Sequence, residues 1–221
     1  MERLGLEHRM AQISVEFLRP IPMAGFRVQA EIDRPGRSVT RTRAEILDDD
    51  RVYVRARGVH MRTLDDFSSD TASVESPQFD LSVPGPFPIR DMLHDERAFN
   101  SSIEARYDPS ASIGTGGPTV MWLRSIVPIL AGEEPSGFQR ICPLADSGNG
   151  ISYNNYLDEV LFVNPDLVVA IHREPQGEWL CAKAVSHWQP DGTGLADSEL
   201  FDRSGSVGRA LQTVLLDPVT D

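Results

Sequence analysis

Glu45-Ile46-Leu47-Asp48 returns 154 residues later as Glu199-Leu200-Phe201-Asp202. Two further pairs share this offset, namely Arg55-Ala56 with Arg209-Ala210, and Arg19 with Arg173. Three matches at one offset, with strand lengths and turns that recur in the same order, predict an internal duplication. The alternative is a generic antiparallel meander in which the short matches are coincidental.

Apolar and polar residues alternate along four runs in each copy, which is the pattern of half-buried strands. The runs of the first copy are residues 11–18, 26–32, 38–47 and 51–61. The runs of the second copy are residues 166–172, 178–188, 194–201 and 207–216. Residues that favour turns separate the runs, so we predict a four-stranded antiparallel meander that occurs twice.

The period of the apolar residues changes between the two copies. Residues 99–107 and 119–129 are predicted strands with a loop between them. Ser136 is then a possible helix N-cap, because apolar residues follow it at helical spacing, at Phe138, Ile141, Leu144 and Ala145. Pro143 lies inside this predicted helix and lacks a backbone donor, so a kink or an early end is expected.

The chain divides at a segment of different composition. Residues 63–94 are rich in Ser, Asp and Pro and lack a sustained period, as an interdomain connection does. We therefore predict a first repeat over residues 1–62, a linker over residues 63–97 and a second repeat over residues 98–221.

The two predicted repeats differ ahead of their meanders. The second has a strand segment and a helix there, whereas the first has only residues 1–10, in which residues 2–7 are similar to the tail of a helix. The first-repeat helix is thus expected to be largely missing, as if the chain began inside a domain. An apolar sheet face without a helix needs another cover, which can be the second repeat's sheet edge and linker, a neighbouring chain or an upstream helix. A homo-oligomer is therefore expected unless an upstream helix covers the face.

Composition narrows the function. The chain has 221 residues, of which 40% are hydrophobic and 24% are charged, and its net charge of −12 disfavours nucleic acid as a partner. We expect a cytoplasmic protein without a membrane span, because no apolar stretch approaches about 20 residues and the N-terminus is charged. Cys142, Cys181 and the five histidines lack the spacing of a metal site, so no metal or other cofactor is implied.

Several motifs share their order and spacing with one known family. Phe17-Leu-Arg-Pro-Ile-Pro and Arg34-Pro-Gly-Arg-Ser-Val match a first-repeat meander, and Ala145-Asp-Ser-Gly-Asn-Gly150 matches a second-repeat helix end. The series continues with Asn164-Pro-Asp-Leu, His172-Arg-Glu-Pro-Gln-Gly-Glu-Trp179, Leu200-Phe-Asp and Gly208-Arg-Ala-Leu-Gln212. Together they resemble the acyl-CoA thioesterase II-like double-hotdog family. This resemblance covers most of the chain except the linker, and it implies an α+β fold in which each antiparallel sheet wraps a central helix.

The same resemblance implies a reaction and three site residues. The reaction is hydrolysis of a fatty acyl-CoA to free acid and CoA by an activated water, which needs a base and donors for the developing oxyanion. In the family this water is held by an Asp on the second-repeat helix, a hydroxyl residue on the following sheet and a Gln on the last strand. These positions match Asp146, Ser186 and Gln212. His187 competes with Ser186, because only one of two successive strand residues can face the helix.

Each site residue also has a simpler interpretation. Asp146 follows Pro143-Leu-Ala, where burial would raise its pKa, but a surface carboxylate at a helix end is equally compatible with the sequence. Gln212 is polar in an apolar strand and corresponds to Gly58 in the first copy, which indicates a site in one repeat only; an outward-facing glutamine is the alternative.

Two other functions belong to the same fold. One is a non-catalytic module that binds acyl-CoA or lipid. The other is a hydratase or dehydratase, for which the predicted helix offers no paired His and Asp.

Overall fold

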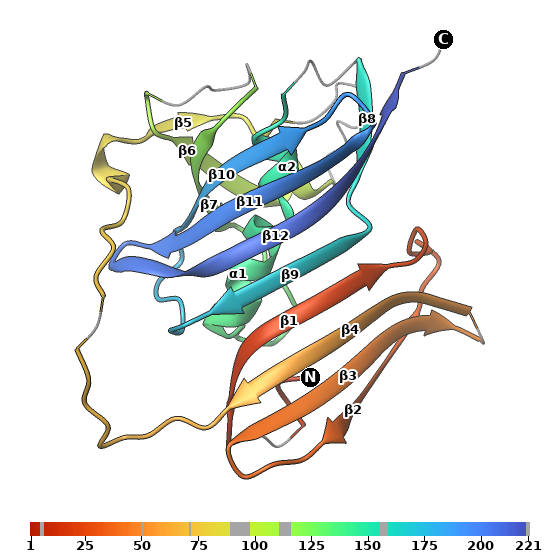
Figure 1. Cartoon of the computed structure of the whole chain (residues 1–221), viewed down its shortest axis with the longest axis vertical. Helices are drawn as coiled ribbons and strands as arrows, with labels where there is room; N and C mark the ends of the chain where they lie inside the picture. The colour runs from red at the N-terminus through yellow and green to blue at the C-terminus, as the bar shows by residue number, and fades with distance from the viewer. Residues whose placement is uncertain are drawn as a thin grey trace.

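The structure is a computed structural model that describes residues 1–4, 7–49, 51–70, 72–88, 98–110, 116–154 and 159–219. Over these residues, twelve strands form one antiparallel sheet (Figure 1). The strand order is β2-β3-β4-β1-β9-β12-β11-β10-β7-β6-β5, and β8 pairs with the end of β12. The first copy supplies β1 (Arg9–Phe17), β2 (Arg27–Arg34), β3 (Val39–Asp48) and β4 (Arg51–Met61).

The second copy repeats these strands. It supplies β9 (Asp166–Ile171), β10 (Leu180–Trp188), β11 (Thr193–Asp202) and β12 (Gly205–Pro218). The first four strands lie in the order β2-β3-β4-β1 and their counterparts in the order β10-β11-β12-β9, so the order is the same in both copies. In the middle of the sheet β1 and β9 run side by side and join the copies (Figure 1).

The strand register is also repeated. Glu45 pairs with Arg55 in the first copy and Glu199 pairs with Arg209 in the second. A bulge follows Ile46 in one copy and Leu200 in the other, again 154 residues apart. Strand order and register therefore agree between the two copies, as the predicted duplication requires.

The predicted four-stranded meander is wrong in one respect. Strands β2, β3 and β4 follow one another, but β1 pairs with β4 and not with β2. The segment between β1 and β2 covers residues 18–26 and contains Pro20 and Pro22, which makes it too long for a tight hairpin. Strand β1 is therefore inserted between β4 and β9, where both of its edges are paired.

The remaining elements extend the second half of the sheet. They are β5 (Val83–Gly85), β6 (Ile103–Tyr107), β7 (Thr119–Ser125) and β8 (Val160–Val163), with 3-10 helices at Phe79–Leu81 and Phe99–Ser102. Strand β5 pairs with β6, and the Phe79 ring packs edge-on against Trp122 with ring centroids 5.3 Å apart. Part of the segment predicted as linker thus belongs to the sheet, and the division into repeats stays a prediction.

The predicted helix is present as α1 (Gly137–Asp146), followed by the short α2 (Gly148–Ile151). Ser136 is its N-cap: the Ser136 Oγ accepts a hydrogen bond from the Gln139 backbone N at 3.0 Å, and the Gln139 Oε1 accepts one from the Ser136 N at 3.1 Å. This reciprocal pair is a capping box. The helix ends three residues after Pro143, as the missing backbone donor predicted.

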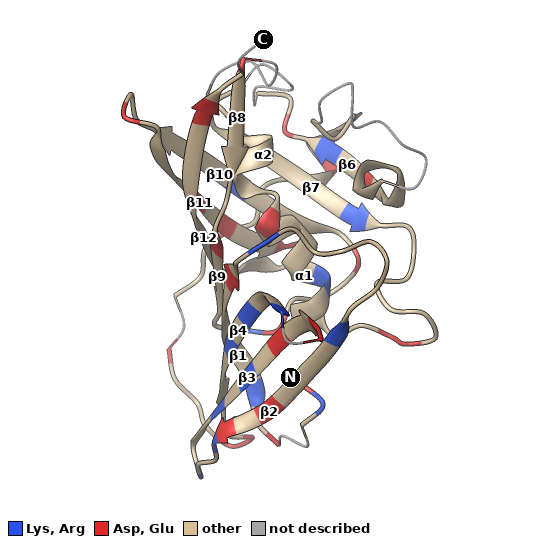
Figure 2. Cartoon of the chain, turned by 90° about the vertical axis from the view of Figure 1, so that its right-hand side faces the viewer, with Lys and Arg blue, Asp and Glu red and all other residues tan. Residues whose placement is uncertain are grey.

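The core lies between α1 and the curled second half of the sheet. Figure 2 shows α1 and α2 between β9–β12 on one side and β6 and β7 on the other. The helix buries Phe138, Ile141, Leu144 and Ala145 in this core. Ile13, Val15 and Phe17 of β1 pack against the same cluster, because alternate residues of a strand point to one face.

The outer strand of the first copy is less well covered. Val28 and Ile32 of β2 are 63% and 41% exposed, and β2 has no buried residue. The sequence predicted an apolar face in need of a cover, and its cover by a second copy of the chain stays a prediction. In the described part of the chain, no helix is long and apolar enough to cross a membrane.

An ion pair is buried at one end of the second copy. The fully buried Asp202 accepts hydrogen bonds from the Arg173 Nη1 and Nη2 at 2.5 and 2.6 Å, and from the backbone N of Gln176 and Ser204 at 2.8 Å each. Burial alone would raise the pKa of Asp202, but the bonds from Arg173 and the two amides outweigh it and place the pKa below its ordinary value. The carboxylate therefore stabilises the fold in its charged form.

We expect Asp202→Ala to lower the free energy of unfolding by about 3–5 kcal/mol, because it leaves the Arg173 charge without its partner. Asp48→Ala, at the equivalent but exposed position of the first copy, is the matched control and should cost no more than about 0.5 kcal/mol. Urea unfolding at pH 7 measures both values. Since the folded-state pKa of Asp202 is lowered, its contribution is complete above about pH 4 to 5 and lost as pH falls through that lowered pKa. Equal losses in the two variants would contradict the assignment.

Candidate active site

Three side chains converge at the end of α1. The Asp146 Oδ1 accepts hydrogen bonds from the Asn164 Nδ2 at 2.9 Å and from the Gln212 Nε2 at 3.2 Å. Gln212 also donates to the backbone carbonyl of Asp146 at 2.9 Å. Asp146 is the last residue of α1, Asn164 precedes β9 and Gln212 lies on β12. The predicted approach of Asp146 and Gln212 is therefore present.

The orientation of the Gln212 amide is fixed by its surroundings. Gln212 is buried, and its Oε1 accepts a hydrogen bond from the backbone N of Asn149 at 3.1 Å. A backbone N–H can only donate, so the oxygen must face Asn149 and the NH₂ group must face Asp146. The predicted alternative, an outward-facing strand glutamine, is wrong.

Gly148 allows the helical segment to approach the sheet at this point. A Cβ atom at Gly148 would lie 2.7 Å from the Ser198 Oγ and 3.0 Å from the Gln212 Oε1. Any larger residue would push α2 away from β11 and β12 and lengthen the bond from Asn149 to Gln212. The motif Asp146-Ser-Gly-Asn-Gly150 thus has a steric reason for its first glycine.

Two opposing effects act on the Asp146 carboxylate. Residue 146 retains exposed surface, yet the protein packed around its carboxyl group raises the pKa of Asp146 above its ordinary value. The hydrogen bonds from Asn164 and Gln212 stabilise the charged form and partly offset this rise. Both bonds reach Oδ1; within the described ranges, no protein donor reaches Oδ2.

Ser186 lies in a neighbouring buried cluster and not at Asp146. Strand alternation turns Ser186 inward and leaves His187 exposed. The Ser186 Oγ donates to the Asn149 Oδ1 at 3.0 Å and lies 2.8 Å from the Ser152 Oγ, while the Trp188 Nε1 also donates to the Asn149 Oδ1 at 2.8 Å. These contacts fix Asn149, whose backbone N in turn orients Gln212.

Sequence reasoning missed Asn164, the third residue at the carboxylate. The motif Asn164-Pro-Asp-Leu was noticed only for its family likeness. A polar residue directly before a proline and a buried strand is a weak indication of a site residue. It becomes specific only when the end of α1 is known to lie beside the start of β9.

The first copy lacks these groups at the equivalent positions. Gly58 corresponds to Gln212, and Met10 corresponds to Asn164. A Cβ atom at Gly58 would lie 2.5 Å from both the Met1 Cε and the Thr42 Oγ1, so neighbouring side chains fill the space. The arrangement around Asp146 therefore occurs in the second copy alone, as the contrast between Gly58 and Gln212 predicted.

Comparison with protein families gives two matches along the chain. Residues 74–216 match the acyl-CoA thioesterase C-terminal domain, and residues 1–61 match the acyl-CoA thioesterase N-terminal domain. The chain belongs to the acyl-CoA thioesterase family. No curated protein matches it significantly.

Solved structures show the same fold as this acyl-CoA thioesterase family member. The tesB protein of Mycobacterium avium subs paratuberculosis superposes with a TM-score of 0.72 at 14% identity, covering 98% of this chain and 82% of that one. The acyl-CoA thioesterase II TesB2 of Mycobacterium marinum gives 0.70 at 18% identity, with 99% and 84% covered. A hot dog fold protein of Alicyclobacillus acidocaldarius gives 0.73 at 15% identity, with 96% and 80% covered. The chain has a hotdog-type fold.

We expect Asn164→Ala to raise the pKa of Asp146 further, because it removes one of the two hydrogen bonds that stabilise the carboxylate. Carboxyl-detected NMR titration measures this pKa in the wild type and the variant. Asn154→Ala, which truncates an exposed asparagine, is the control and should leave the pKa unchanged. An unchanged or lowered pKa in Asn164→Ala would show that the contact does not stabilise the ionised acid.

Proposed function

We propose that the protein hydrolyses a fatty acyl-CoA to a free acid and CoA with a water molecule activated by Asp146. The observation that supports this proposal is the difference between the two carboxylate oxygens of Asp146. Two carboxamide donors orient Oδ1 of Asp146, and Oδ2 is left able to accept a hydrogen bond from water. We also propose that the two copies are two hotdog units, of which the second surrounds α1.

The chemistry follows from that arrangement. Oδ2 takes a proton from the water as its oxygen attacks the thioester carbon, and a tetrahedral oxyanion forms. The intermediate then collapses, the C–S bond breaks, and the leaving thiolate of CoA takes the proton back from Asp146. A raised pKa makes Asp146 a stronger base than an ordinary carboxylate, which suits it to accept a proton near neutral pH.

A non-catalytic module that binds acyl-CoA is the second candidate. One feature favours it: the group that contacts Asp146 from the start of β9 is the carboxamide of Asn164, whereas the family resemblance implies a hydroxyl group in the site. A carboxamide donates to the carboxylate as a hydroxyl does, so the orientation of Asp146 is retained. Only a thioesterase releases thiol from acyl-CoA, so a measurement of thiol release separates the two candidate functions.

We expect Asp146→Asn to lower kcat for thiol release from acyl-CoA by about 10²–10⁴-fold, because the variant cannot accept the proton. Asp166→Asn is the matched control. Asp166 lies only two residues beyond Asn164, but its Oδ1 accepts from the N and Oγ1 of Thr213, on the opposite face of β12 from Gln212. It should keep most of the activity. Free-thiol release from acyl-CoAs of several chain lengths measures both variants and the chain-length preference.

The pH dependence gives an independent test of the base. Activity should fall as pH drops through the pKa of Asp146, and Asn164→Ala should move that fall to higher pH. Wild-type protein that binds acyl-CoA without releasing thiol would support the binding module. Asp146→Asn with wild-type turnover would exclude Asp146 as the base.

A further inference from the structure

The two copies differ at one pair of equivalent places. The place is covered in the second copy, which we call the closed form, and uncovered in the first copy, which we call the open form. The closed form is the buried pair Arg173–Asp202 of the second copy. The segment before the 3-10 helix Phe79–Leu81 covers it, because the Ser206 N donates to the Val74 carbonyl at 3.1 Å and the Ser76 Oγ donates to the Asp202 carbonyl at 2.6 Å. A Cβ atom at Gly205 would lie 2.9 Å from the Val74 carbonyl oxygen, so this cover requires a glycine there.

The open form lies at the equivalent place in the first copy. Arg19 corresponds to Arg173 and keeps one of its contacts: the Arg19 Nη1 donates to the Val52 carbonyl at 2.6 Å, as the Arg173 Nε donates to the Ser206 carbonyl at 3.0 Å. The ion pair is not repeated. Asp48, which corresponds to Asp202, is exposed, and no hydrogen bond or ion pair joins it to Arg19.

Two substitutions between the copies explain the difference. Pro22 stands where Gln176 donates its backbone N–H to Asp202, and proline has no N–H to donate. Arg51 stands where the covered Gly205 lies, so the first copy has a second guanidinium in place of a contact with the covering segment. Both changes open the site, and Arg51 also adds a positive charge to it.

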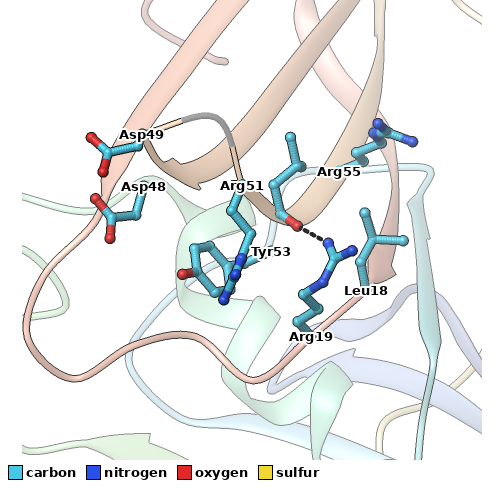
Figure 3. Close-up of a pocket in the computed structure, with 8 residues that line it drawn as sticks. Leu18, Arg19, Asp48, Asp49, Arg51, Tyr53 and Arg55 are labelled. Carbon is cyan, nitrogen blue, oxygen red and sulfur yellow. Dashed lines mark hydrogen bonds between the residues drawn. The ribbon is translucent and has the colours of Figure 1, made fainter.

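An open pocket of about 970 Å³ results, and Figure 3 shows its side chains. Arg19, Arg51 and Arg55 line it together with Asp48 and Asp49, whose carboxylates lie at the far end from Arg19. Arg55 is paired with Glu45 at 3.1 Å. Within the ranges that the structure describes, neither Arg19 nor Arg51 lies within ion-pair distance of a carboxylate.

The pocket adjoins the site at Asp146. The Phe17 N donates to the Pro165 carbonyl at 2.8 Å, and Pro165 directly follows Asn164. Arg19 follows Phe17 by two residues, so the chain reaches the pocket within at most about 7 Å. The Arg19 N donates to the Tyr53 carbonyl at 3.2 Å, which fixes the chain where it enters the pocket. A ligand of modest length can therefore contact both places.

We propose that this pocket binds the phosphate groups of the CoA thioester while its thioester carbon lies at Asp146. The inference rests on the proposed function. CoA carries a diphosphate and a ribose phosphate separated from the sulfur by the pantetheine arm, and a guanidinium group binds phosphate oxygens in pairs. In a chain of net charge −12, local arginines without carboxylate partners must supply the attraction. Asp48 and Asp49 repel phosphate from their end and so direct it toward Arg19 and Arg51.

The test compares one acyl group on two carriers. We expect Arg51→Gln and Arg19→Gln to raise KM for acyl-CoA about tenfold with little change in kcat, a loss of about 1.4 kcal/mol. The same acyl group on N-acetylcysteamine, which has no phosphate, should react equally well with wild type and variants. Arg57→Gln, an exposed arginine of β4 outside the pocket, is the control and should match the wild type with both substrates.

Calorimetric titration with CoA itself makes the inference independent of turnover. Weaker binding of CoA by Arg51→Gln than by Arg57→Gln supports the pocket even if the wild type hydrolyses no thioester, in which case only the proposed function fails. Equal KM and equal CoA affinity in those two variants would overturn the pocket. Inorganic pyrophosphate that binds as tightly as CoA would show a site for free phosphate and overturn the assignment to CoA.

Discussion

The pairing of β1 with β9 is the interaction on which the rest of the structure depends. These strands join the two copies edge to edge, with Ser14 opposite Val168, the residue that corresponds to Ser14 itself. A pseudo-twofold axis therefore passes through this pair. Because the strands are antiparallel, the end of β1 lies beside the start of β9, which places a loop of the first copy next to Asn164 of the second.

Because the fold is duplicated, the β1–β9 pair has two equivalent ends, and the residues at these two ends differ. At one end of the β1–β9 pair, α1 presents Asp146 to Asn164 and Gln212. The pocket lined by Arg19 and Arg51 lies at the same end. At the other end, Gly58 and Met10 stand in place of Gln212 and Asn164. Arg173 there forms a buried ion pair with Asp202. Equivalent backbones thus carry the candidate active site at one end and a buried ion pair at the other. A buried ion pair is costly to form, so it is stable only where amides and a covering segment complete it.

The sequence was sufficient for local structure and for the repeat, and insufficient where loops decide contacts. The alternation of β3 and β11, the N-cap at Ser136 and the early end after Pro143 depend on neighbours within a few residues, so patterns reveal them. The partnership of Asp146 with Gln212 came from family likeness, since no spacing in the chain indicates it. Ser186 faces inward as predicted, but which polar groups reach Asp146 depends on where the end of α1 lies relative to β9 and β12. The position of β1 beside β4 was missed because turn composition indicates a break in the chain and not the strand it joins.

The fixed amide of Gln212 also determines where a proton on Asp146 can reside. Oδ1 already faces two N–H donors, from Asn164 and Gln212, and a hydrogen placed there would meet other hydrogens. Rotation of Gln212 cannot relieve the conflict, because its oxygen is bound to the backbone N–H of Asn149. A neutral Asp146 must therefore carry its proton on Oδ2, in either the syn or the anti orientation. The two oxygens of one carboxyl group are thus chemically distinct, one a permanent acceptor and the other the sole point of proton exchange.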